Sequence, residues 1–374
     1  MITITKYPND YCFTGNPVIF EALIDSSESI NVEISIEEKT YSTTYYPFKI
    51  SEGSYKVSMN ISDFLHFENK IEIPEDGIIS AIQGFSLPFQ VKIGDDYIFN
   101  GNALRGGISN EAFLQLNENN YDIFSYRLLS YTYQFLFTTR TNLNEIKIQE
   151  SELYPFIFIH PGVPLIFKSK TGKEIITQAQ TAGIFCIMNI KNVIDEFQEV
   201  TDRIDVLVNG VYAFHFTILP KKISHEKYLL KFRNSFGAFE VLEVTGKAMH
   251  SPEFLDENLW EASNEYYFYE EHRSRVKSRN VIEVESGYKD RSKFSFIQDL
   301  IQSDEIYFIY PDGYIFRCHV IADRMQYRNH ITEPTSVNLK IRAVFDEEFI
   351  LPKIEYPDDI FFRIFDNTHD KTFN

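Results

Sequence analysis

Residues 228–247 read Tyr-Leu-Leu-Lys-Phe-Arg-Asn-Ser-Phe-Gly-Ala-Phe-Glu-Val-Leu-Glu-Val-Thr-Gly-Lys. In the first part of this stretch, Tyr, Leu and Phe alternate with Leu, Lys and Arg, which is typical of a β-strand. Asn234–Gly237 then supplies turn residues, and 239–245 returns with strand-forming residues. We therefore predict a β-hairpin with Gly237 at a positive φ angle.

The first third of the chain has the same strand character. Apolar and polar residues alternate strictly over 30–36 and 55–61, so each segment presents one apolar face. We predict a β-sandwich-like domain over residues 1–115, closed by a glycine-rich loop at 100–109, with a domain boundary near 110–122 in the polar stretch 117–120. Its other expected elements are a strand at 18–24 and a hairpin at 91–99.

The middle third repeats this style and predicts a second β domain over residues 122–225. Asn209-Gly210 separates the apolar segments 204–208 and 211–218, which is the strongest short signal for a two-residue hairpin turn. Further short strands are expected at 131–138, 145–148, 156–160 and 164–168.

The last third, residues 226–374, predicts a smaller α+β domain with a C-terminal arm. Asp290 is placed to cap a helix whose Phe294, Ile297, Leu300 and Ile301 share one face. A hairpin at 306–321 and a strand at 337–345 follow. The expected fold class is mainly β, with two β-sandwich-like modules followed by the α+β module.

Charge and cysteine content exclude several functions. The formal net charge of −18 argues against nucleic-acid binding, which needs a clustered basic surface. The three cysteines are scattered among apolar neighbours, so we expect reduced thiols and neither disulfides nor a zinc site. The N-terminus has no basic, apolar leader pattern and no long apolar run follows, so we expect synthesis in a cytoplasm and no membrane insertion.

No catalytic or cofactor motif stands out. The glycines of 100–107 match neither phosphate-loop pattern, and His160 and His215 each lack a second ligand or a carboxylate at a useful spacing. The acidic pairs 95–96 and 358–359 are interpreted as solvated turns. We therefore expect no enzyme activity and no cofactor, although distant carboxylates brought together by folding would leave a glycan hydrolase open.

Two segments are expected to contact neighbouring subunits. A basic block at residues 272–293 follows directly on the acidic stretch 253–271. Adjacent blocks of opposite charge suit head-to-tail contact between copies of the chain. The C-terminal arm carries apolar residues that need burial. The alternative is that both segments fold back on their own domain. The candidate contact residues are Arg273, Arg275, Lys277 and Arg279 in the basic block and Phe361, Phe362 and Phe365 in the C-terminal arm.

An aromatic run at 266–269 offers a different function. Tyr266, Tyr267 and Tyr269 could contact a glycan, since sugars stack on aromatic rings. On a strand these residues alternate between faces, so packing between β layers is the alternative interpretation.

Several segments together resemble one family of tail or baseplate-type virion structural proteins from phages and prophages of Bacteroidota. They are Cys12-Phe-Thr-Gly-Asn-Pro-Val-Ile-Phe20, Leu104-Arg-Gly-Gly-Ile-Ser109, Phe135-Leu-Phe-Thr-Thr139, Glu152-Leu-Tyr-Pro-Phe156 and the hairpin at 228–247. We call these the family-like segments. The acidic stretch and the long aromatic tail depart from the family pattern.

The resemblance implies a structural subunit that forms homo-oligomers or binds other particle proteins, within a virion or phage-tail-like particle assembled in the bacterial cytoplasm. A carbohydrate- or receptor-binding module of the same kind of particle is the alternative, with a cell-surface glycan as its partner. The absence of a catalytic constellation from the sequence agrees with the structural role.

Overall fold

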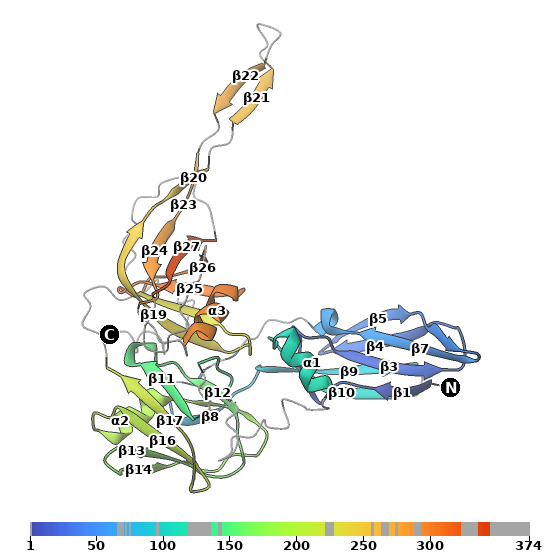
Figure 1. The fold of residues 1–374 in the computed structure, drawn as a ribbon, viewed down its shortest axis with the longest axis horizontal. Helices are drawn as coiled ribbons and strands as arrows, with labels where there is room; N and C mark the ends of the chain where they lie inside the picture. Colours follow the sequence, from blue (N-terminus) through green and yellow to red (C-terminus); the bar gives the residue numbers. More distant parts are fainter. Residues whose placement is uncertain are drawn as a thin grey trace. The chain divides into compact units, whose positions relative to one another are not determined.

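The computed structural model describes residues 2–65, 71, 73–74, 76–94, 97–118, 136–140, 144–220, 228–255, 258–262, 269–273, 276–287, 293–322 and 336–344. The described chain is mainly β, with several sheets and short helices, as predicted (Figure 1). By its internal contacts the chain divides into two compact units. Unit 1 consists of Met1–Ile146, Tyr154–Thr217 and Asn234–Ala238, and unit 2 of Lys147–Leu153, Ile218–Arg233 and Phe239–Asn374. The three domain ranges expected from the sequence stay a prediction.

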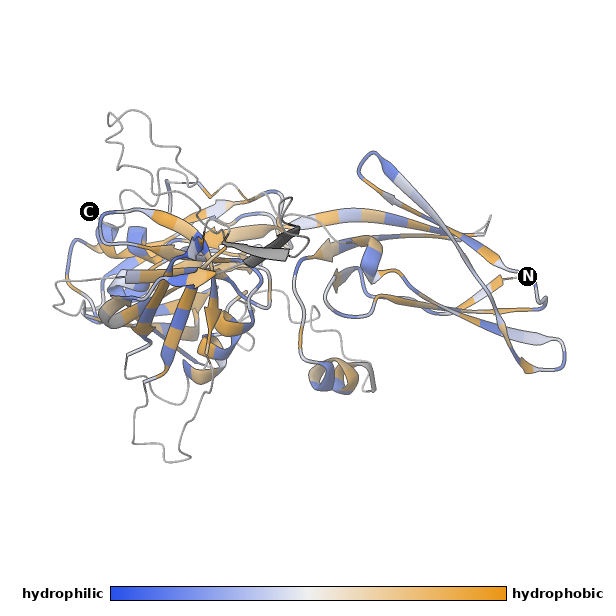
Figure 2. Ribbon diagram, turned by 90° about the horizontal axis from the view of Figure 1, so that it is seen from above, coloured by the Kyte–Doolittle hydropathy of each residue, from blue (hydrophilic) through white to orange (hydrophobic). Residues whose placement is uncertain are grey.

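The N-terminal part of unit 1 is a β-sandwich. One sheet has the order β1-β3-β7-β6 and the other β2-β10-β9-β4-β5. Alternating residues of both sheets fill the core, which includes Phe20, Val32 and Met59. The strands are β1 (Ile2–Lys6), β2 (Tyr11–Phe13), β3 (Ile19–Ile24), β4 (Ile30–Ile36), β5 (Lys39–Tyr45), β6 (Phe48–Ser51), β7 (Ser54–Asn60), β9 (Ser86–Ile93) and β10 (Tyr97–Leu104), with a 3-10 turn η1 (Ser62–Leu65). In Figure 2, polar and apolar residues alternate along these strands.

One prediction for this region was wrong. Residues 100–104 were expected in a loop, but β10 pairs with β9 as far as Leu104 and with β2 in parallel. Gly101 fits this strand because a Cβ there would lie 2.7 Å from the Phe89 ring across the pair. Helix α1 (Asn110–Glu118) follows the sandwich, and the Ser109 hydroxyl accepts a hydrogen bond from Ala112 N at its start.

The second β module of unit 1 has two sheets. A five-stranded sheet runs β11-β17-β16-β13-β14, and a three-stranded sheet runs β12-β15-β8. The predicted Asn209-Gly210 hairpin is confirmed, with φ angles of 50° and 80° at the two turn residues. The elements are β11 (Glu145–Gln149), η3 (Glu150–Glu152), β12 (Phe156–Ile159), β13 (Leu165–Ser169), β14 (Glu174–Ile176), β15 (Phe185–Met188), α2 (Ile190–Phe197), β16 (Arg203–Val208) and β17 (Val211–Leu219). Of these, η3 and the ends of β11 and β17, from Lys147 and Ile218 on, are counted with unit 2.

Strand β8 (Ile79–Ala81) joins this second module although it lies within the predicted first domain. It pairs with β15, and Ile82 and Phe85 after it share one core with Phe137, Ile157 and Phe185. The two β modules of unit 1 therefore share buried residues. Of the strand expected at 131–138, only Leu136 is described in a bridge, to Phe158; 131–135 lie outside the described residues.

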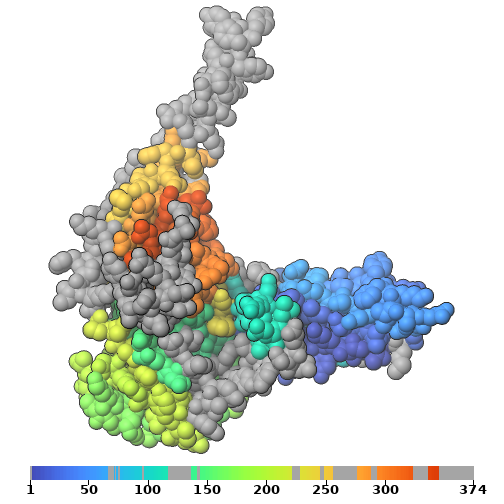
Figure 3. All heavy atoms as spheres, viewed as in Figure 1, coloured from blue at the N-terminus to red at the C-terminus, as the bar shows by residue number. Residues whose placement is uncertain are grey.

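Unit 2 is built on a closed barrel with the strand order β18-β19-β24-β27-β26-β25. The hairpin predicted at 228–247 is confirmed as β18 (Tyr228–Arg233) and β19 (Phe239–His250), with Gly237 at φ 82°. The interior of the barrel holds Phe232, Phe296 and Phe308. The remaining barrel strands are β24 (Val281–Glu285), β25 (Ile306–Ile309), β26 (Ile315–Ile321) and β27 (Asn338–Ala343). Figure 3 draws the heavy atoms as spheres, with the N-terminal sandwich in blue and the second β module of unit 1 in green.

Helix α3 (Phe294–Gln302) forms as predicted and buries Phe294, Ile297 and Leu300 in the barrel. The residue at its N-cap position is Lys293, whose side chain makes no capping hydrogen bond. Asp290 lies outside the described residues.

A two-stranded arm extends the β19–β24 hairpin (Figure 1). Strand β20 (Glu253–Leu255) pairs with β23 (Lys277–Arg279), and β21 (Asn258–Ala262) pairs with β22 (Tyr269–Arg273). We call 253–279 the arm. Its two pairs form separate two-stranded sheets.

Candidate functional site: a glycine junction and a buried charged row

The family-like segments meet in unit 1 around the hairpin turn Asn234–Ala238. Gly107 N donates to Ser235 O at 2.7 Å, and Gly15 N donates to Gly106 O at 2.7 Å. The Asn234 amide donates to Phe137 O at 2.9 Å. We call this meeting point the glycine junction and define it as Phe13–Asn16, Leu104–Ile108, Phe137 and Asn234–Ala238.

Glycine is required in the junction because backbone packs directly on backbone. A Cβ on Gly237 would lie 2.1 Å from Arg105 O, and one on Gly106 would lie 2.2 Å from Ser235 O. Both glycines also have positive φ angles, 82° and 123°, which side chains disfavour. Gly15 is equally restricted, with 2.6 Å between its Cβ position and Gly106 O. The glycine-rich segment is thus a backbone contact surface.

Two buried asparagines hold the junction together. Asn234 Oδ1 accepts hydrogen bonds from Phe236 N and Ala238 N, both at 3.0 Å, while its amide binds Phe137 O. The Asn16 amide group pairs with the backbone of Ile108 through bonds of 2.9 and 2.8 Å. Both side chains are at most 5% exposed. Because a buried amide left without partners is costly, these bonds fix the position of each segment.

An apolar core lies beside these bonds. Phe13, Leu104, Phe137 and Ala238 are buried in one cluster, and Phe236 packs against it. Phe13 and Phe236 have ring centroids 6.0 Å apart. The turn therefore contributes apolar contacts as well as hydrogen bonds to unit 1.

Unit 2 contains a buried charged row that the alternation in the sequence did not predict to be buried. All six residues of β18 are buried, including Lys231 and Arg233 at 4% and 5% exposure. The side chains of Lys231 and Arg233 both lie over the Phe239 ring, with Lys231 Nζ and Arg233 Cζ 4.7 and 4.5 Å from its centroid. The side chains on both faces of β18 are thus buried.

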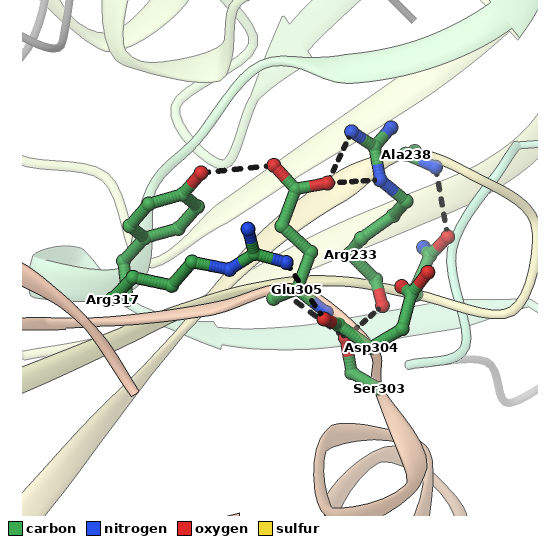
Figure 4. A network of polar contacts seen from close by, with 8 residues as sticks. Arg233, Ala238, Ser303, Asp304, Glu305 and Arg317 are labelled. Carbon is green, nitrogen blue, oxygen red and sulfur yellow. Dashed lines mark hydrogen bonds and ion pairs between the residues drawn. The ribbon is translucent and has the colours of Figure 1, made fainter. Parts of the chain in front are cut away.

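Arg233 is neutralised by Glu305 (Figure 4). Its Nε and Nη2 atoms donate to Glu305 Oε2 at 2.8 and 2.6 Å, and Tyr307 donates its hydroxyl to Oε1 at 2.9 Å. Ser303 Oγ donates to the carbonyls of Arg233 and Glu305. Burial, with the neighbouring Glu305 carboxylate, raises the pKa of Tyr307 to about 12. These contacts tie β18 to β25 and satisfy the charges internally.

The family-like segment 152–156 begins against the same hairpin, within unit 2. Glu152 Oε1 accepts a hydrogen bond from Glu243 N at 2.9 Å, and Ser151 Oγ donates to the Glu243 carboxylate. Glu152 and Glu243 are 2% and 1% exposed. Each family-like segment therefore supplies a residue to the glycine junction or to this contact.

The arm places one residue of the acidic stretch opposite one residue of the basic block, whereas Glu261 stands opposite Glu270. Glu253 stands opposite Arg279, and Asn258 opposite Arg273. Glu253 also binds Lys340, and that bond, with the positive charges nearby, lowers the pKa of the Glu253 carboxyl. The chain thus supplies one partner for its own basic block, while contact with neighbouring copies remains a prediction.

Only some of the other predicted contact residues lie in the part of the chain that the structure describes. Tyr269 stands opposite Ala262 in the arm, and Lys277 opposite Leu255. Tyr266, Tyr267, Arg275, Phe361, Phe362 and Phe365 lie outside the described residues. The described candidates Tyr269, Arg273, Lys277 and Arg279 therefore lie on strands β22 and β23 of the arm.

The isolated histidines and cysteines have ordinary structural surroundings. His160 is fully buried, its Nδ1 accepts a hydrogen bond from Gly162 N at 3.0 Å, and burial lowers its pKa. The His160 Nε2 atom has no hydrogen-bond partner among the described residues. Cys12, Cys186 and Cys318 are free, as predicted, and burial raises the pKa of Cys186 to about 11.

In the described parts of the chain, no three His, Cys, Asp or Glu side chains gather closely enough to hold a metal ion. The described helices are all too short or too polar to cross a bilayer.

The sequence indicated the segments that form the glycine junction but not that they contact one another. The signal available was the clustering of Gly15, Gly106, Gly107 and Gly237 next to Asn16 and Asn234. Such glycines indicate close backbone approach, but which segments approach one another depends on the tertiary fold.

No known family model matches the chain, and no curated protein sequence matches it. Among solved structures, it is similar to the I-band fragment I67–I69 from titin, with a TM-score of 0.16 and 7% identity over 76% of this chain and 93% of the titin fragment. An E-to-A mutated variant of the same titin domains gives the same values. At so low a TM-score, the similarity carries no argument about fold or function.

Proposed function

We propose that this chain is a non-enzymatic structural subunit of a phage or phage-tail-like particle, acting in tail or baseplate assembly. The proposal rests on the resemblance of the family-like segments. One observation supports it most: these segments supply residues that hold backbone segments together at the glycine junction and against Glu243. Residues used in this way preserve an architecture, which is what a structural subunit requires.

The arm is the part of the chain that we assign to assembly. Its strands β21 and β22 pair only with each other in the described chain, and a two-stranded ribbon is marginally stable in water without a further layer. A neighbouring subunit would supply that layer. Phe254 in β20, 71% exposed, offers an apolar contact near the base of the arm.

The test is to look for the protein in particles. Lysates of a host that carries the gene, induced for prophage, would be fractionated, and purified particles analysed by mass spectrometry and negative-stain microscopy. We expect the chain at a fixed ratio to other particle proteins and defined rings or stalks from purified protein. A strictly monomeric protein that is missing from purified particles would refute the proposal. A glycan array separates the receptor-binding alternative, since a scaffold should bind no glycan specifically.

A further inference from the structure

One edge of the N-terminal sandwich is a long, exposed strand. Strand β5 (Lys39–Tyr45) is the outermost strand of its sheet, where it pairs with β4 (Figure 1). It is the longest edge strand in the described sheets, and most of its residues are exposed. Among the described residues, no backbone hydrogen bond from outside the sheet reaches β5. Its outer N–H and C=O groups are therefore available to another strand.

Other edges of the described sheets have features that limit strand pairing. Strands β1 and β6 each have an irregular register and a lysine, Lys6 and Lys49, and strands β2, β8 and β14 have only three residues each. Short strands, bulges and lysines are the features by which proteins protect sheet edges. In contrast, β5 pairs with β4 in continuous register, and its one charged residue, Lys39, stands at its end. Such an edge is suited to the addition of a further strand.

Exposed apolar side chains lie beside this edge. Tyr46, directly after β5, is 80% exposed, and Phe48 and Ile50 on β6 are 52% and 51% exposed. Strand β6 is the edge of the second sheet of the sandwich and begins three residues after the end of β5. The Tyr45 hydroxyl donates to Asn60 O in β7, the neighbour of β6. A partner that pairs with β5 therefore also approaches this apolar surface.

We propose that β5 pairs with β5 of a second copy of this chain, antiparallel and about a two-fold axis at Ser42. The two five-stranded sheets then continue into one another, and the interface is isologous, with the same surface used on both copies. The inference goes beyond the proposed function, which assigns assembly to the arm. In this register the facing residues are Lys39 with Tyr45, Thr40 with Thr44, Tyr41 with Thr43, and Ser42 with its own copy.

The charges of β5 fit a second copy of the same strand. A strand that pairs with itself meets its own charges, so self-pairing requires that no like charges face each other. The one charge of β5 is on Lys39, and the two-fold register places it opposite Tyr45 of the second copy rather than opposite another ammonium. Facing threonines, and threonine facing tyrosine, are pairs that stabilise neighbouring strands.

The first test introduces a like charge at the two-fold axis of the full-length chain. Ser42→Lys brings two ammonium groups together in the dimer, but within one chain the new ammonium stands opposite Glu33 of β4, which favours the folded strand. Ser58→Lys is the control, because Ser58 is exposed on the inner strand β7, opposite Glu21.

Sedimentation velocity over a concentration series reads the result. The unmodified chain should form a dimer. The concentration at which half of the protein is dimeric should rise at least about tenfold for Ser42→Lys, and less than about twofold for Ser58→Lys. A parent chain that stays monomeric at high concentration, or a dimer that Ser42→Lys leaves unchanged, would overturn the proposal.

The second test reads the register. Ser42→Glu alone should also weaken the dimer, and circular dichroism checks that this variant is folded. An equimolar mixture of Ser42→Lys and Ser42→Glu should recover the dimer as a heterodimer, because opposite charges then face each other at the axis. If the mixture stays as monomeric as its two components, Ser42 does not face its own copy and the proposed pairing is wrong.

These outcomes are distinguishable from failure of the particle role. A chain that is found in particles but is monomeric when purified would refute the β5 pairing and leave the proposed function intact. A dimer disrupted by Ser42→Lys but missing from purified particles would refute the particle role and leave the pairing intact.

Discussion

Gly237 and Gly313 have almost the same backbone conformation but opposite surroundings. Their φ angles are 82° and 85°, yet a Cβ at Gly237 would meet Arg105 O at 2.1 Å and one at Gly313 would meet nothing within 4 Å. We expect Gly313→Ala to lower the free energy of unfolding by about 1 kcal/mol through conformational strain. Gly237→Ala should cost about 3 kcal/mol because the clash is added. Urea unfolding followed by circular dichroism checks this, and equal losses would contradict the junction geometry.

The buried ion pair is a second residue-scale feature with a matched control. Arg233 and Glu305 have side chains 5% and 16% exposed, whereas Lys168 and Glu174 form a pair with 42% exposure on each side. Glu305→Gln removes the negative charge that the buried Arg233 guanidinium binds, so we expect a loss of about 3 kcal/mol. Glu174→Gln should cost less than about 1 kcal/mol. The two variants are compared by urea unfolding in the same buffer, and similar losses would show that the Arg233 charge is not enclosed.

His160 makes stability depend on pH. Burial lowers its pKa in the folded protein, so between the folded and unfolded pKa values the unfolded chain binds the extra proton. Its contribution is complete above the ordinary pKa of about 6.5 and is lost as pH falls below that value, by at most about 1.4 kcal/mol per pH unit. His160→Asn keeps an acceptor for Gly162 N and does not titrate. Urea midpoints from pH 7.5 to 5 should therefore fall less steeply for the variant, and parallel curves would contradict this assignment.

At the scale of elements, the arm can be separated from the barrel. Strands β21 and β22 pair with each other, and Leu255 stands opposite Lys277 at the end of the preceding pair. Replacing residues 256–276 with Asn-Gly creates a two-residue hairpin turn at that point. We expect the free energy of unfolding of this variant to stay within about 0.5 kcal/mol of that of the parent protein. Its incorporation into particles should be lost. A large loss of stability would show that the arm supports the barrel, and normal incorporation would remove its assembly role.

For the whole molecule, the N-terminal sandwich should fold without the rest. Its main core lies between Val18 and Ala103, and the strands of both sheets lie between Ile2 and Leu104. We expect a fragment of residues 1–118 to give a dispersed NMR spectrum and a cooperative urea transition. In a fragment of residues 1–225, the part beyond residue 118 should be less ordered than in the full chain. The reason is that the fragment lacks Phe236 and Ala238 of the junction core. An unfolded 1–118 fragment would show that the sandwich also needs the second module.

The sequence by itself determined the local elements. Strict alternation predicted β4 and β7, Asn-Gly predicted the β16–β17 turn, and the stretch 228–247 predicted the β18–β19 hairpin, because these signals depend only on neighbouring residues. The pattern failed at β10, where pairing with β9 and β2 carried the strand through Gly101.

Only the tertiary structure decided what those elements are for. It buried Lys231 and Arg233 on a row that alternation marked as polar, placed β8 in the second module, and brought Gly15, Gly106 and Gly237 into backbone contact. These outcomes depend on residues that are distant in the chain meeting in space, and a single sequence holds no signal for which segments will meet. The physical reason is that alternation records which residues avoid water in one strand, whereas burial of a charge needs a partner such as Glu305 from another strand.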